Sequence, residues 1–303
     1  KDSTATLLLA IEREAENLRA VFADTGHEHP ATYDYLAYLE QETGITIERI
    51  KPDFSDRIAH KRDVVETKWR AEGVSEQIIE QALEVLQPTG NPFLDMCLWK
   101  GRFPSTRVRF CTQELKVFPI QQVFNPLLQH HETGEIYSWQ GVRADESLAR
   151  SGLPELDEVG EGLWNYRPIL TWTAADVFDF HRKHGVKWNP LYEQGMGRVG
   201  CMPCINVRKD ELQQIAARFP DQIERVAEWE RLVSMASKRG MATFTSARGV
   251  ANEDISLETH GIHNTVEWSK TTHGGQQYDL IASTTDNSQC SSAYGLCETG
   301  VQS

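Results

Sequence analysis

The order of elements expected in the first fifty residues restricts the fold more than any other feature of the chain. Apolar side chains recur at helical spacing over residues 3–16, and a short apolar run over residues 18–24 predicts a buried strand that ends in a turn. A second helix is expected over residues 30–42, and residues 46–50 alternate like a second strand. This helix–strand–helix–strand order predicts an α/β fold with a doubly wound, mostly parallel sheet.

The rest of the chain is expected to add a further strand and several helices. We expect helices over 55–87, loops over the Gly-, Pro- and Lys/Arg-rich stretch 88–119, a strand over 136–143, a helix over 174–183 and two helices over 209–238, separated near Pro220. Residues 241–268 are rich in Gly, Ser, Thr and Asn and are expected to form a mobile segment, followed by a polar tail. The sequence therefore predicts a core domain over residues 1–208 and a helical, loop-rich C-terminal extension with a cysteine-containing tail over residues 209–303.

Two turns follow expected strands, at Asp24-Thr25-Gly26 and at Gly141-Val142-Arg143. Ligands of parallel α/β sheets bind at the carboxyl ends of the strands, where the loops gather. We therefore expect both turns to face one common site.

Charge and cysteine usage narrow the class of protein. The 303 residues carry a formal net charge of −13, and no apolar run approaches the ~18 residues that a membrane span needs. We expect a cytoplasmic protein with no membrane segment. Its six cysteines then favour a metal site or a catalytic role over a disulfide framework.

One basic stretch interrupts the acidic chain. It contains Lys100, Arg102, Arg107, Arg109 and Lys116. The stretch is either a solvated loop or a local site for a polyanion.

The most specific chemical signal is the pair Cys201 and Cys204 in Gly-Cys-Met-Pro-Cys. This spacing lets two thiolates reach one metal or cluster, and it also occurs in redox pairs. Four thiolates chosen from this pair, Cys111, Cys290 and Cys297 would complete a tetrahedral zinc site or a 4Fe–4S cluster. Cys97 lies in an apolar run and is expected to pack in the core.

Other polar positions suggest a nucleotide site. Lys1-Asp2-Ser3 at a helix start suits phosphate binding, and Arg143 could hold a phosphate. His27 and His29 could bind a metal, although we favour a turn that contacts a base or ribose.

In this order the motifs resemble the phosphoadenosine phosphosulfate (PAPS) reductase-like branch of the adenine-nucleotide α-hydrolases, over about residues 1–212. The matching segments are Phe22-Ala-Asp-Thr-Gly-His-Glu-His-Pro-Ala-Thr-Tyr33, Cys111-Thr-x-x-Leu-Lys-x-x-Pro119, Gly141-Val-Arg-Ala-Asp-Glu-Ser147, Arg167-Pro-Ile-Leu-x-Trp-Thr-x-x-Asp-Val177, Asn189-Pro-Leu-Tyr192 and Gly200-Cys-x-Pro-Cys204.

The resemblance implies a parallel sheet with helices on both sides and a phosphate loop of the form Ser-Gly-Gly-Lys-Asp-Ser. Lys1-Asp2-Ser3 resembles the end of that loop, so we expect the preceding strand and glycines to lie outside the sequence given. The resemblance implies catalytic roles for Lys1, Asp24, Lys116 and Arg143. It implies nucleotide contacts by Lys1, Asp2, Ser3, Asp24, Thr25, Gly26, Gly141 and Arg143.

Three departures separate the chain from true sulfonucleotide reductases. It has no Glu-Cys-Gly-x-His motif, it has Cys111-Thr112 where cluster-bearing reductases have two adjacent cysteines, and it has the Lys-Asp-Ser ending that their phosphate loop usually lacks. These features resemble the ATP-pyrophosphatase component of DNA phosphorothioation, of the DndC/SspD type.

That resemblance implies ATP with Mg²⁺, adenylation of a target oxygen and its replacement by sulfur, with a 4Fe–4S cluster (alternatively Zn²⁺). The implied partners are DNA, a cysteine desulfurase that supplies sulfur, and other DNA-modification proteins. Two alternatives remain at this point: a PAPS or adenosine phosphosulfate (APS) reductase, and a non-catalytic nucleotide-binding scaffold.

Overall fold

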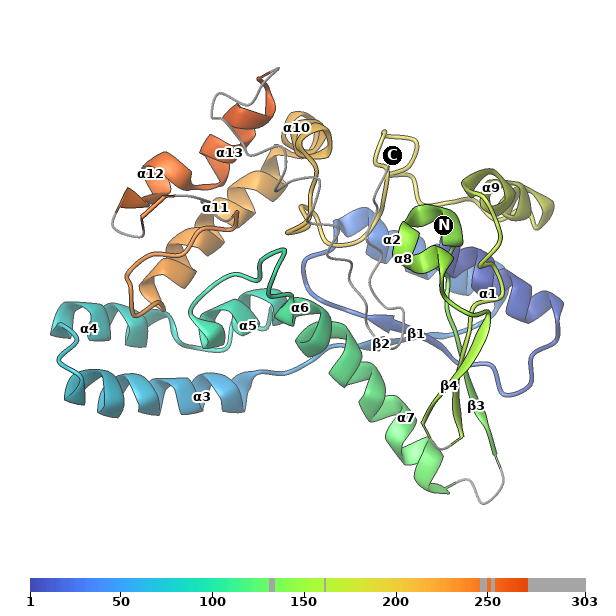
Figure 1. Ribbon diagram of the computed structural model, residues 1–303, viewed down its shortest axis with the longest axis horizontal. Coiled ribbons are helices and arrows are strands. Elements are labelled where there is room, and N and C mark those ends of the chain that lie inside the picture. The colour runs from blue at the N-terminus through green and yellow to red at the C-terminus, as the bar shows by residue number, and fades with distance from the viewer. Residues whose placement is uncertain (131–133, 161, 246–249, 252–253, 272–303) are drawn as a thin grey trace.

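The first two expected strands form a parallel pair. In the computed structural model, which describes residues 1–130, 134–160, 162–245, 250–251 and 254–271, β1 (Ala20–Ala23) pairs with β2 (Ile47–Ile50). Helix α2 (Pro30–Thr43) connects them (Figure 1). The helix begins at a proline, whose fixed φ suits a first turn, and ends at Gly44 with φ +70°, a left-handed conformation that favours glycine.

A second sheet contains the other described strands. Its order is β3 (Ile136–Trp139), β5 (Leu163–Tyr166), β4 (Leu156–Gly160), with β3 parallel and β4 antiparallel to β5. The α/β class is confirmed. The doubly wound parallel sheet is observed only in part, because the described strands form two separate sheets, each with one parallel pair.

Helices cover the strands and pack against one another. Besides α2, the helices on the side of the strands are α1 (Asp2–Glu12), α7 (Phe118–His130), η3 (Ala144–Glu146), α8 (Leu148–Ser151) and α9 (Ala174–Lys183) (Figure 1). Ala5 and Leu9 of α1 pack against Ile169 and Val177, which fixes α1 beside α9. A capping box at Thr173 begins α9 at the predicted residue.

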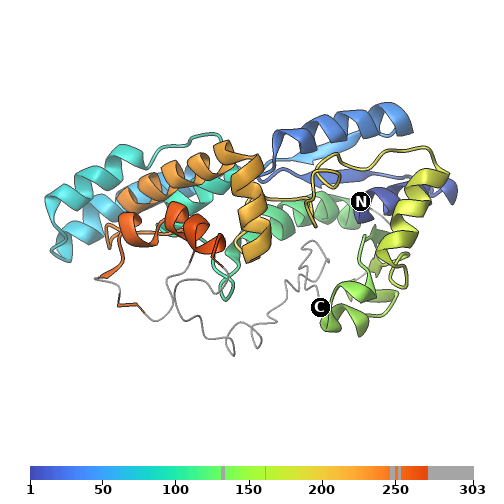
Figure 2. The ribbon, with the colours of Figure 1, turned by 90° about the horizontal axis from the view of Figure 1, so that it is seen from above.

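The remaining helices form a layer to one side of the strands (Figures 1 and 2). They are α3 (Ser55–Val64), η1 (Val65–Trp69), α4 (Glu76–Val85), α5 (Pro92–Lys100), α6 (Phe110–Thr112), η2 (Gln113–Val117), α10 (Lys209–Arg218), α11 (Pro220–Met235), α12 (Leu257–His260) and α13 (Ile262–Ser269). Helices from both sides of residue 208 contribute to the same hydrophobic cluster. No helix in the described ranges is long and apolar enough to cross a membrane.

Two loop predictions are wrong. Residues 88–119 contain α5, α6 and η2, because Asn91 accepts a 3.0 Å hydrogen bond from the Leu94 amide and Pro92 occupies the first turn. The described part of 241–268 contains α12 and α13, and α13 buries Ile262 and Val266. In both places the composition typical of loops hid a short helix that is stabilised by packing.

Glu230 of α11 positions α13 and gives a testable effect on stability. Its buried carboxylate accepts hydrogen bonds from the amides of Phe244 (2.7 Å) and Ile262 (2.8 Å). Glu230→Ala leaves both donors without this acceptor, and we expect the free energy of unfolding to fall by about 2–4 kcal/mol in urea titrations. Glu228→Ala removes an exposed carboxylate of the same helix and should change it by less than about 0.5 kcal/mol.

The same residue predicts a pH dependence. Burial raises the pKa of Glu230 from 4.5 to about 7. The native state therefore binds more protons than the unfolded state between these values, so the contribution of Glu230 to stability falls as the pH rises through this window. Glu230→Gln should lack that component, and an unchanged pH slope of the unfolding free energy in this variant would contradict the assignment.

Candidate functional site

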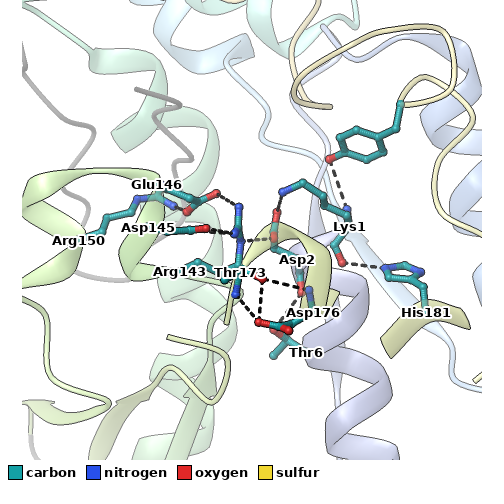
Figure 3. A network of polar contacts seen from close by, with 11 residues as sticks. Lys1, Asp2, Thr6, Arg143, Asp145, Glu146, Arg150, Thr173, Asp176 and His181 are labelled. Carbon is teal, nitrogen blue, oxygen red and sulfur yellow. Dashed lines mark hydrogen bonds and ion pairs between the residues drawn. The ribbon is translucent and has the colours of Figure 1, made fainter. Parts of the chain in front are cut away.

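The start of α1 is fixed by a buried ionic network (Figure 3). Arg143 Nε donates to Asp2 Oδ1 (2.7 Å) and Lys1 Nζ donates to Asp2 Oδ2 (2.7 Å). Arg143 Nη1 also bonds both carboxylate oxygens of Asp145, each at 2.7 Å. Asp2 is 0% and Arg143 4% exposed. Burial opposes ionisation of Asp2, but the neighbouring cations outweigh it and lower the pKa of Asp2.

Gly141 allows the turn after β3 to approach this helix start. A Cβ at this position would lie 2.7 Å from the backbone of both Asp2 and Ser3, so a side chain has no room there. The carboxyl end of β3 therefore packs directly against the N-terminus of α1.

A cavity of about 430 Å³ opens at this junction. It lies between the two sheets, lined by β1 on one side and by Ser138–Gly141 on the other, and its lining includes the apolar side chains of Leu36, Leu39 and Ile47. Its polar lining includes Lys1, Ser3, Thr4, Glu28, Lys116, Asn189, Tyr192, Arg198, Cys201 and Cys204. Lys1 and Ser3 at the helix start thus share one cavity with the thiols of the Cys-x-x-Cys pair.

The turn after β1 supplies the acidic side of the site. Thr25 Oγ1 donates to Glu28 Oε1 (2.7 Å) and lies 3.5 Å from Cys201 Sγ. Tyr33 donates to Asp24 Oδ1 (2.7 Å) and to Glu28 Oε2 (3.3 Å). Glu28 is only 4% exposed, and burial raises its pKa.

The cysteine loop is joined to this turn through the backbone. Glu28 and Cys201 form an antiparallel bridge, and the Met202 amide donates to the His27 carbonyl (2.8 Å). Arg225 of α11 donates to the Met202 carbonyl (3.2 Å) and its Nη2 lies 3.2 Å from His27 Nδ1. A helix beyond residue 208 therefore holds both loops.

Three cysteines and two cations share this environment. Burial and then Glu28 raise the pKa of Cys201 to about 12, although Lys116 acts in the opposite direction. Burial and then Cys204 raise the pKa of Cys111 to about 11. Burial would lower the pKa of Lys116, but Cys201 and Glu28 outweigh it and raise that pKa, while Cys204 raises the pKa of Arg198.

The side chains of this site fit a metal or cluster in their chemistry, but their geometry alone does not complete one. The donor chemistry fits one, because Cys201 and Cys204 line the cavity together with Lys116 and Arg198, which would offset thiolate charge. Cys204 also contributes to the raised pKa of both Cys111 and Cys201. Their geometry alone completes no centre, because within the described residues no three His, Cys, Asp or Glu side chains are grouped to hold a metal.

Gly26 and Cys97 also lie among the described residues. Gly26 packs against α5, since a Cβ there would lie 2.7 Å from Pro92 Cδ. Cys97 is fully buried, as its apolar neighbours indicate. Cys290 and Cys297 lie outside the described residues.

The two histidines of the turn have structural surroundings. The His27 ring centroid lies 4.4 Å from that of Phe93 and 4.9 Å from that of Trp229, and burial lowers its pKa well below the usual value. His29 accepts a 3.1 Å hydrogen bond from the Ala31 amide and begins α2. Neither imidazole joins a group of three potential metal ligands among the described residues.

Sequence reasoning missed Glu28 and Arg225. Glu28 belongs to the singled-out Asp24–Pro30 segment, but only the bridge to Cys201 reveals its burial. Arg225 is one of several charged residues on α11, and nothing in the local pattern distinguishes it.

The fold and the cavity define an α/β protein in which one cavity adjoins a helix N-terminus and a pair of thiols. The family model of the phosphoadenosine phosphosulfate reductase domain matches residues 1–207. The chain belongs to this family.

Named relatives show how broad the family is. The chain is 49% identical to an uncharacterised 37.8 kDa protein of Escherichia phage 186, over 98% of this chain and 94% of that protein. It is 24% identical to the adenosine 5′-phosphosulfate reductase of Allochromatium vinosum and 22% identical to the phosphoadenosine 5′-phosphosulfate reductase of Vibrio vulnificus, over 64% and 65% of this chain. Both of these relatives are named as reductases, so the family includes enzymes, and the chain spans 60% of the length of each.

One solved structure matches this chain with a lower sequence identity than these relatives. The PAPS reductase of Candida auris, in complex with phosphate, matches 67% of this chain and 78% of its own, with a TM-score of 0.40 and 19% identity.

Proposed function

We propose that this protein is an ATP pyrophosphatase that adenylates an acceptor oxygen for sulfur insertion, and that the acceptor is a DNA backbone phosphate. The observation that carries the proposal is the single cavity that joins the N-terminus of α1 to the Cys201/Cys204 thiols. A nucleotide and a sulfur-bearing group need to meet in such a place. The missing reductase motif favours ATP over PAPS as the nucleotide.

The described residues suit a triphosphate. The first turn of α1 offers amides that have no acceptor within the helix and the positive end of the helix dipole. Lys1, Lys116 and Arg198 add positive charge around the cavity. Arg143 is held by Asp2 and Asp145, so we assign it the role of fixing this helix start. Mg²⁺, when bound with ATP, would neutralise the pyrophosphate that leaves.

The proposed reaction has two steps. The acceptor oxygen attacks the α-phosphorus of ATP, and the bond to the β-phosphate breaks with release of pyrophosphate. The terminal sulfur of a persulfide from a cysteine-desulfurase partner then attacks the acceptor phosphorus, and AMP leaves with the original oxygen. A second thiol, acting as the reductant, attacks the inner sulfur of the adduct, which releases the thiolated phosphate and leaves a disulfide with the carrier cysteine. Other DNA-modification proteins would present the DNA.

We further propose that Cys111, Cys201 and Cys204 hold a 4Fe–4S cluster, with Cys290 or Cys297 as the fourth ligand and Zn²⁺ as the alternative occupant. A cluster there would supply redox or sulfur-binding chemistry beside the nucleotide. The positive charges of Lys116 and Arg198 would stabilise its thiolate ligands.

Substitution of Lys1 tests the nucleotide assignment. We expect Lys1→Ala to lower the rate of pyrophosphate release from ATP by the full-length protein about 10²–10³-fold, because one preorganised cation at the phosphates is lost. Lys1→Arg should restore part of the rate. Lys183→Ala, which removes an exposed cation paired with Glu12, should keep it.

The competing reductase predicts a different outcome of the same assay. Turnover of PAPS with thioredoxin, without pyrophosphate release from ATP, would overturn the proposal. Binding of ATP with no turnover in the presence of DNA and a sulfur donor would instead identify a non-catalytic scaffold.

A further inference from the structure

Cations from three distant segments gather on the helical layer. Arg57 and Lys61 lie one turn apart on α3, Lys100 and Arg102 lie at the end of α5, and Lys238 follows α11. These helices pack together beside the strands (Figures 1 and 2). We call these five residues the cationic belt.

The first part of the belt surrounds Trp99. The Arg57 guanidinium carbon lies 5.1 Å and Lys100 Nζ 3.8 Å from the centroid of its ring. Arg102 lies 5.5 Å from the ring of Phe110, and so does Lys100 Nζ. The two rings thus hold three cations next to one another.

The second part continues toward the end of α11. Lys61 Nζ lies 4.7 Å from the centroid of Trp69, and the nearby Lys238 contributes to a lowered pKa of Lys61 after the larger effect of burial. A Cβ on Gly101 would lie 3.1 Å from the Ala236 carbonyl oxygen, which places the end of α5 against the segment that leads to Lys238.

Ion pairs with carboxylates neutralise only part of the positive charge of the cationic belt. Lys100 pairs with Glu114 (3.0 Å) and Lys238 pairs with Glu72. Arg57, Lys61 and Arg102 contact rings and form no ion pair with a carboxylate of the described residues. In a chain of net charge −13, such a cluster is a local exception.

We infer that the cationic belt binds the phosphate backbone of duplex DNA. Each cation that neutralises a phosphate releases counterions, so attraction to the backbone survives the acidic remainder of the chain, whose field is screened beyond about 8–10 Å. Trp99 is half-buried and stacks on Phe54 (5.8 Å, 23°), so we assign it to holding cations and not to stacking on bases. The contacts are therefore independent of sequence. This inference rests on the proposed function in one respect: DNA is taken as the bound polyanion because a DNA backbone phosphate is the proposed acceptor.

The test uses the full-length protein and a fluorescein-labelled duplex of roughly two helical turns, with binding followed by anisotropy from about 50 to 200 mM salt. Arg57→Ala and Arg102→Ala should each weaken binding about tenfold at 0.1 M salt and lower the slope of log K against log salt by about 1, and the double variant should show both losses. Arg182→Ala and Arg231→Ala, which remove exposed arginines elsewhere, serve as matched controls.

The outcomes separate the belt from the ATP reaction. Unchanged affinity and slope in the double variant, or equal losses in the control variants, would overturn the belt even if pyrophosphate is released. Tighter binding of an RNA duplex of the same sequence would overturn the assignment to DNA. ATP binding should be the same in all five variants, and failure of ATP turnover with the belt effects intact would count against the proposed function alone.

Discussion

Arg143→Ala should lower the free energy of unfolding by about 3–5 kcal/mol, which is among the largest effects expected for a single substitution in this protein. The reason is the burial of both partners: Asp2 is 0% and Arg143 4% exposed, and their ion pair is 2.7 Å long. Without the guanidinium, the Asp2 carboxylate loses one of its two cations while it remains out of water. Urea denaturation measures the loss directly.

A double-mutant cycle separates this pair from general damage. Asp2→Asn removes the charge that Arg143 compensates, so the double variant should lose clearly less than the sum of the two single variants. Additive losses would show that Arg143 acts through Asp145 and Glu146 instead, which it also contacts. Because the neighbouring cations lower the pKa of Asp2, the wild-type contribution is present above the unfolded-state pKa and is lost as the pH falls through the native value.

Cys201→Ser should remove the proposed cluster. We expect anaerobically purified wild-type protein to absorb in the visible range and to contain iron and sulfide, and we expect the variant to be colourless, with metal binding weakened more than about 100-fold. Serine is close in size to cysteine and can keep a polar contact with Thr25 Oγ1, which lies 3.5 Å from Cys201 Sγ, so the fold should persist by circular dichroism.

Cys97→Ala provides the matched control for this experiment. Cys97 is fully buried among apolar side chains of α5, and its loss should leave the iron content unchanged. Equal iron in wild type and Cys201→Ser would contradict the role of Cys201. A colourless wild type that contains zinc would contradict the cluster and leave the thiol site as a zinc site.

Local sequence patterns predicted those parts of the fold whose stabilising contacts are close in the chain. The helix after Thr173 follows from a capping box within four residues, and the break between α10 and α11 follows from Pro220. The parallel pairing of β1 and β2 follows from the α2 connection between them. The helices within residues 88–119 could not be predicted, because Gly, Pro and basic residues are typical of loops while the burial of Phe93 and Met96 depends on other helices.

The candidate site divides in the same way. The sequence by itself singled out Cys201 and Cys204, the turn at Asp24, and Lys1 at a helix start, because each pattern carries its chemistry within a few residues. Only the tertiary structure decided that Arg143 bonds to Asp2, 141 positions away. It also decided that Lys116 lies beside the thiols and that cations of α3, of the end of α5 and of the segment after α11 lie near one another. The physical reason is that burial and electrostatic pairing act across space, and the packing of distant helices determines which charges share a low-dielectric environment.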